Sequence, residues 1–128
     1  MGQQQLLLII LGVIIVGIAI AVGLSLFTAN SIQANKDAII NDVNNIAANA
    51  YQYRIRTSSM GGGNNAYDNY NIPTRLSSNS NATYKAVGAG QTCTITGTSI
   101  ANSPCTVVGA VAATGKLTLT FTGSDFTQ

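Results

Sequence analysis

The fold of this chain is decided by residues 6–24, which read LLLIILGVIIVGIAIAVGL. All nineteen of these residues are apolar or glycine, and Phe27 extends the run after one serine. An α-helix of this length is about 28 Å long, which matches the hydrocarbon core of a bilayer. We therefore expect a helix that lies in a membrane at some stage of the protein's life.

The residues before this stretch argue against a secretory signal peptide. A signal peptide has a basic n-region and an h-region of roughly 7 to 15 residues, whereas the first charged residue here is Lys36. Lys or Arg beside a span normally sets its orientation, yet the N-terminal flank is MGQQQ. We therefore expect that a basic leader has been removed and that Met1 is the mature N-terminus.

The helix is expected to continue far beyond the apolar stretch. Neither proline nor glycine occurs between Leu24 and Met60, so nothing breaks it. Residues 28–56 have an apolar face at helical spacing, with Lys36 as its one interruption. Its members are Ala29, Ile32, Ile39, Val43, Ile46, Ala50 and Tyr53. A helix of about 55 residues would be roughly 80 Å long, far above the average length.

The rest of the chain predicts a small β-rich head. Residues 57–81 read as a loop with Tyr67, Tyr70, Ile72 and Leu76 as anchors, and strands are expected at 83–87, 92–96, 106–111 and 116–122. The fold class is therefore α+β: a long N-terminal helix, apolar and then amphipathic, packed on a small C-terminal antiparallel sheet. Its parts are 1–27 (membrane or filament core), 28–56 (amphipathic half), 57–81 (αβ-loop) and 82–128 (head).

The composition argues against catalysis, metal binding and nucleic-acid binding. The chain has no His and no Glu, and its four acids and six bases are scattered. Neither a general base, a ligand set nor a basic stripe is evident. We therefore expect no enzyme activity, no cofactor, no metal and no nucleic-acid partner. Asn, Ser and Thr are abundant while charged residues are few, so hydroxyl and amide groups hydrate the surface. Such a surface suits an extracellular protein.

Cys93 and Cys105 are the two cysteines of the chain. A chain with an export segment reaches an oxidising compartment, so we expect these two residues to be bonded to each other. A disulfide closing a loop of this size would stabilise the head by about 3 kcal/mol on chain-entropy estimates.

An unbroken helix of this kind, ending in a small β-rich domain with a disulfide, resembles the type IV pilins and pseudopilins. The resemblance implies cleavage by a prepilin peptidase, for which Met1 is a suitable first residue, and assembly by a pilus machine. Family members usually have Glu at the fifth mature position, where this chain has Gln5. The family's proline late in the apolar helix is also missing. A glutamine still accepts a hydrogen bond from a neighbour's N-terminal amine, without the cost of burying a carboxylate.

The resemblance implies a homo-oligomeric helical filament, stored in the inner (cytoplasmic) membrane before assembly and then extracellular on the cell surface. The expected filament-core residues are Met1, Gln3, Gln4, Gln5, Leu6, Leu7, Leu8, Ile14 and Gly17. Gly17 has two interpretations: ordinary use of glycine in membrane helices, or close helix approach and local loosening. Two alternative functions stay open. One is a pseudopilin or minor pilin of a type II secretion or DNA-uptake machine, and the other is a non-polymerising membrane-anchored exported domain.

Asn81 begins the tripeptide Asn-Ala-Thr, which fits the pattern for N-linked glycosylation. Patterns of three residues occur by chance, so the alternative is an ordinary loop residue. Both interpretations place Asn81 at the surface of the head, just before the first expected strand.

Overall fold

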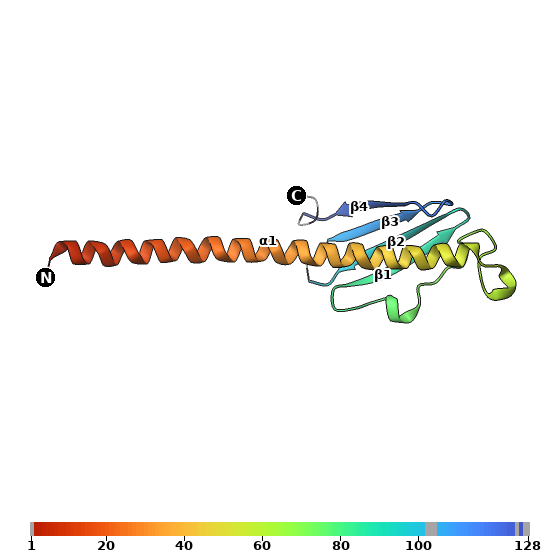
Figure 1. The fold of residues 1–128 in the computed structure, drawn as a ribbon, viewed down its shortest axis with the longest axis horizontal. Helices are drawn as coiled ribbons and strands as arrows, with labels where there is room; N and C mark the ends of the chain where they lie inside the picture. Colours follow the sequence, from red (N-terminus) through yellow and green to blue (C-terminus); the bar gives the residue numbers. More distant parts are fainter. Residues whose placement is uncertain (1, 102–104, 125, 127–128) are drawn as a thin grey trace. The chain divides into compact units, whose positions relative to one another are not determined.

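The computed structural model describes residues 2–101, 105–124 and 126. The chain divides into two compact units, Met1–Ser31 and Ile32–Gln128. The elements in chain order are α1 (Gln3–Ile55), η1 (Ser58–Met60), η2 (Thr74–Leu76), β1 (Ala82–Ala89), β2 (Thr92–Ser99), β3 (Thr106–Val111) and β4 (Leu117–Thr122). Figure 1 labels α1 and the four strands. The fold is α+β, as the sequence predicted.

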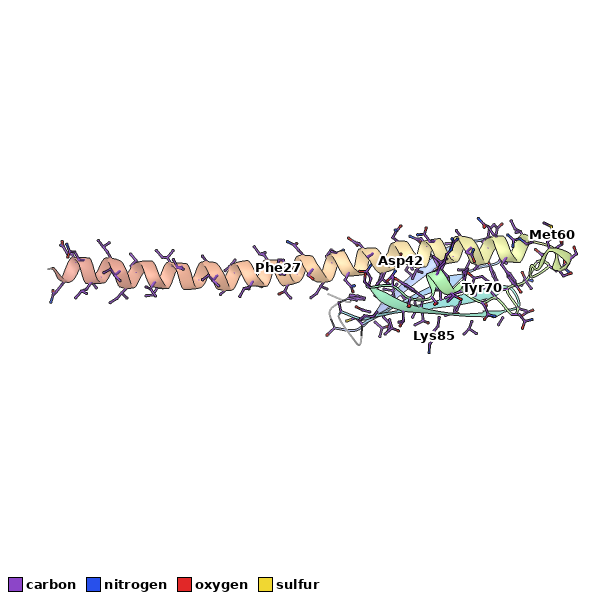
Figure 2. The ribbon with its side chains drawn as sticks, turned by 90° about the horizontal axis from the view of Figure 1, so that it is seen from below. Phe27, Asp42, Met60, Tyr70 and Lys85 are labelled. Atoms are coloured by element: carbon purple, nitrogen blue, oxygen red, sulfur yellow. The ribbon has the colours of Figure 1, made fainter. Side chains whose placement is uncertain are left out.

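The predicted unbroken helix is confirmed, because α1 runs for 53 residues from Gln3 to Ile55. Among the described residues it is the helix that is long and apolar enough to cross a membrane, judged by length and composition. No part of its most apolar window is buried. Figure 2 shows side chains projecting from the sides of α1 as far as Phe27.

The second unit contains a four-stranded antiparallel sheet in the order β1-β2-β3-β4, so each strand pairs with the next along the chain. The four predicted strands are confirmed, and β1 and β2 are longer than expected. Two hairpin turns contain a glycine with positive φ, Gly90 at 57° and Gly115 at 88°.

The amphipathic part of α1 lies on one face of this sheet. Ile39, Val43, Ile46 and Ala50 are at most 1% exposed, and they form one core with the inner side chains of the strands. Those inner side chains include Ile95, Val107 and Val111. The predicted apolar face is confirmed at these four positions, while Ala29 is exposed and Tyr53 is half-buried.

Two glycines allow the helix to approach the sheet closely. A Cβ atom on Gly97 would lie 3.0 Å from Cγ2 of Ile39, and one on Gly109 would lie 2.8 Å from Cγ1 of Val43. Real Cβ atoms essentially never have contacts below 3.0 Å. Side chains at these positions would therefore push the helix and the sheet apart.

The long loop between α1 and β1 is anchored largely as the sequence predicted. Tyr67 and Tyr70 are buried, and Ile72 and Leu76 are half-buried against the core. The Tyr67 hydroxyl donates to the carbonyl of Ala112 at 2.8 Å, and the Tyr70 hydroxyl donates to Oδ1 of Asn49 at 2.8 Å. The loop is therefore part of the folded head.

Candidate assembly surface

The candidate functional surface is the N-terminal part of α1. Sixteen large apolar side chains between Leu6 and Phe27 are 52–72% exposed. Fully burying such side chains is worth about 1.5–3 kcal/mol each, so covering the exposed parts of all sixteen would stabilise the system by on the order of 20 kcal/mol. A helix that is apolar on every side is stable only when lipid or protein covers it.

The predicted assembly residues lie together at the beginning of this surface. Those that the structure describes are exposed on α1: Gln3, Gln4, Gln5, Leu6, Leu7, Leu8, Ile14 and Gly17. Met1 lies outside the described residues. A Cβ atom on Gly17 would meet no heavy atom within 4 Å. Any close approach at Gly17 would therefore have to come from another molecule.

The predicted disulfide is wrong, because Cys93 and Cys105 are both free thiols. The register explains why. Cys93 lies opposite Val111, whereas the carbonyl of Cys105 accepts a hydrogen bond from the N–H of Ser99. Ser99 is six residues further along β2, which is about 20 Å in a strand. Disulfides need Cα atoms roughly 4.4–6.8 Å apart, so the two cysteines cannot bond within one chain.

Both thiols are instead buried parts of the core. Cys93 is 0% and Cys105 is 1% exposed. Burial raises the pKa of the Cys93 thiol to about 11, since a thiolate would lose its hydration there. The thiol of Cys93 therefore behaves as a small apolar group rather than as a nucleophile.

Asn81 is half-buried and lies just before β1. Its backbone carbonyl accepts hydrogen bonds from the side-chain amide of Asn35 and from the N–H of Ile100. Its own N–H donates to Oδ1 of Asn79 at 2.8 Å. Asn81 is thus a structural corner of the head, and its glycosylation stays a prediction.

Sequence reasoning missed the polar groups that join α1 to the head. Oδ2 of Asp42 accepts hydrogen bonds from the Tyr84 hydroxyl and from the amide of Asn79. Lys36 was interpreted as an interruption of the apolar face. Its Nζ instead donates to the carbonyl of Phe126 at 3.0 Å and lies 4.3 Å from the centre of the Phe121 ring. No sequence signal marked these pairings, because the partners are 37 to 90 residues apart.

The buried base Arg54, in the last turn of α1, is held by neutral groups. Its Nη2 donates to Oε1 of Gln91 at 2.8 Å, and its guanidinium lies 5.9 Å from the Tyr67 ring centre. The position also places a positive charge beside the carbonyl end of the helix dipole, which is favourable. Arg54 therefore closes the end of the helix onto the head.

In the part of the chain that the structure describes, no group of three His, Cys, Asp or Glu side chains could hold a metal ion. A hollow of about 440 Å³ beside β1 is lined by Asn71, Ile72, Ser77, Tyr84, Lys85, Ala86 and Val87, and it is open to solvent. Lys85 in this set lies on the sheet face turned away from α1 (Figure 2).

Comparison with known proteins gives no relative: no family model, no curated protein and no solved structure matches the chain. The class of protein is therefore defined by the fold and the exposed surface alone. It is an α+β protein whose long helix begins with an uncovered apolar segment of membrane length.

Proposed function

We propose that this chain is the structural subunit of an extracellular type IV pilus-like filament, and that it polymerises through the N-terminal part of α1. The observation that carries the proposal is the apolar surface of residues 6–27, which is uncovered on all sides of the helix. In the membrane this surface contacts lipid. In the filament it contacts the same surface of other copies.

Polymerisation is favoured over a simple membrane anchor by the continuity of α1. An anchored monomer needs only a span and a flexible linker, whereas α1 continues as helix from Gln3 to Ile55. The low share of charged residues, 8% of the chain, lets many copies stack with little repulsion. An anchored exported domain is the alternative, as is a pseudopilin or minor pilin of a secretion or DNA-uptake machine.

Transfer from lipid to filament costs little hydrophobic free energy, because both surroundings are apolar. Assembly is then driven by packing, by polar contacts of Gln3, Gln4 and Gln5, and by the assembly machine. We propose no catalytic step for the chain itself. Its partners are further copies, the membrane, a prepilin peptidase and the pilus assembly machinery.

Electron microscopy of material sheared from the cell surface, with mass spectrometry of the same material, tests the proposal. We expect filaments whose main protein is this chain. Filaments that contain the chain only in traces would favour the minor-subunit alternative. Its presence in membranes without any filament would favour the anchored domain.

A further inference from the structure

The two edges of the sheet differ in how far other segments of the chain cover them. The beginning of the outer edge of β1 is covered, since the N–H of Tyr84 donates to the carbonyl of Ser77 and the N–H of Asn79 donates to the carbonyl of Ala82. Ser78 also forms a bridge with Thr83. Within the described residues, no such backbone hydrogen bond reaches the outer edge of β4. The chain therefore covers part of one edge of the sheet and leaves the other edge open.

The hairpin between β3 and β4 shows which groups point to the open edge. The N–H of Ala112 donates to the carbonyl of Lys116 at 2.9 Å, so these two residues form a hydrogen-bonded pair. Such pairs alternate along an antiparallel ladder. The N–H and C=O groups of Leu117, Leu119 and Phe121 therefore point away from β3, toward the open edge.

This edge also lacks the usual protection against strand pairing. Proteins protect edges with charges, prolines or bulges, whereas β4 reads LTLTFT and pairs with β3 residue for residue. Its inner side chains, Leu117, Leu119 and Phe121, are only half-buried. The inner side chains of the two central strands, such as Ile95 and Val107, are 0% exposed. The core is therefore incomplete along β4.

We propose that the open edge of β4 binds β4 of a second copy of this chain, antiparallel, with Leu119 opposite Leu119. In this register Leu117 lies opposite Phe121, so the apolar inner side chains of the two copies meet. The outward-pointing N–H and C=O groups of all three residues then find partners. On the outer face, Thr118 lies opposite Thr120. Registers shifted by two residues leave one of the apolar side chains without an apolar partner, and a shift of one residue places leucine opposite threonine.

The charges of the strand ends are compatible with this pairing. Lys116 precedes β4, and in the proposed register it lies opposite Thr122 of the other copy. The two Lys116 residues are then six positions apart along the strands, or about 20 Å. This separation exceeds the Debye length of about 8 Å at physiological salt, so their repulsion is largely screened.

The symmetry of this contact indicates whether it joins subunits within one filament or between two filaments. This part of the inference rests on the proposed function. A pairing of β4 with β4 is isologous and closes on two copies, whereas a filament grows through heterologous contacts. The pairing therefore joins heads of two different filaments. One edge contact is smaller than a standard stable interface, but many heads along two filaments act together and raise the avidity.

Engineered cysteines on the outer face of β4 test the register directly. In the proposed pairing Thr118 and Thr120 form a non-hydrogen-bonded pair, whose Cα atoms are about 4.5 Å apart and suit a disulfide. Both side chains are exposed, so their replacement leaves the core intact. Filaments of Thr118→Cys and filaments of Thr120→Cys are prepared separately, mixed and mildly oxidised, and linked peptides are identified by mass spectrometry.

We expect the mixture to give several-fold more linked dimer than either variant alone. Thr94→Cys, also exposed but in the interior strand β2, is the matched control and should give background linkage. Stronger linkage in Thr120→Cys alone, or background linkage in the mixture, would overturn the proposal.

The same full-length variants are also oxidised at high concentration in detergent micelles. If the chain makes no filaments, the proposed function fails while this second arm still decides the pairing. A disulfide there between the Thr118→Cys chain and the Thr120→Cys chain supports the pairing, and background linkage overturns it.

Discussion

The hydroxyl of Tyr84 on β1 donates a 2.5 Å hydrogen bond to Oδ2 of Asp42 on α1. The amide of Asn79, from the loop between them, donates to the same oxygen at 2.7 Å. Burial, and then the hydrogen bond and charge of Asp42, raise the pKa of Tyr84 above its usual range. One carboxylate thus joins the helix, the loop and the first strand.

Tyr84→Phe should therefore destabilise the head. Hydrogen bonds to charged groups contribute about 1.5–3 kcal/mol, and we expect a loss in this range. The measurement is denaturant unfolding of the full chain in detergent, followed by near-UV circular dichroism. Tyr51→Phe, a half-buried tyrosine on α1, is the matched control and should change the stability by less than about 0.5 kcal/mol. Equal effects of the two changes would show that the Asp42 contact is not stabilising.

The free cysteines predict a specific labelling pattern. Denatured but unreduced protein should take up two alkylating groups, because Cys93 and Cys105 are too far apart to bond. The folded protein should react slowly, since both thiols are buried and the pKa of Cys93 is raised to about 11. Intact-mass measurement counts the alkylating groups on the folded and on the denatured protein. Unlabelled denatured protein would mean that the cysteines are oxidised.

Alkaline pH should weaken the head. Burial, and to a lesser degree the charge of Cys93, raise the pKa of Tyr70 from 10.0 to about 12. Between these values the unfolded chain binds fewer protons than the folded chain, so stability falls as pH rises. The contribution of Tyr70 is fully present below pH 10 and lost by about pH 12. In Tyr70→Phe, the free energy of unfolding should depend less steeply on pH above 10. An unchanged slope would argue against a buried, neutral Tyr70.

Gly97→Ala and Gly109→Ala should each separate α1 from the sheet. A methyl group at Gly97 meets Ile39 of α1 at 3.0 Å, and one at Gly109 meets Val43 of α1 at 2.8 Å. Overpacking of this kind typically costs about 1–3 kcal/mol. Thr96→Ala, on the outer face of the same strand as Gly97, is the control for lost strand propensity. Thermal unfolding of the three variants should therefore rank both glycine variants below Thr96→Ala.

The fold could be predicted from the sequence because its signals are local. The apolar run of residues 6–24, the absence of helix breakers up to Met60 and the alternation of Leu117, Leu119 and Phe121 each define an element without reference to the rest of the chain. The fold class and strand positions follow from these patterns.

The pairing of side chains within the head could not be predicted in the same way. The cysteine pairing depends on the register of β2 against β3, and sequence alone does not define that register when the loop between the strands is long. Lys36 was misread because its partner, the carbonyl of Phe126, is a backbone group 90 residues away. Composition indicates which polar groups exist, but only the tertiary fold pairs them.

The most direct test of filament assembly through α1 is the yield of surface filaments from cells that make Ile14→Asp, normalised to the subunit present in the membrane. A buried, unpaired carboxylate at mid-helix costs about 2.5–3.5 kcal/mol on membrane-insertion scales, and inside the filament it has no partner. Thr120→Asp also introduces an aspartate, on the exposed face of the head, and is the matched control. We predict filaments from Thr120→Asp and none from Ile14→Asp, whereas filaments of normal length and yield from Ile14→Asp would contradict a helical apolar core.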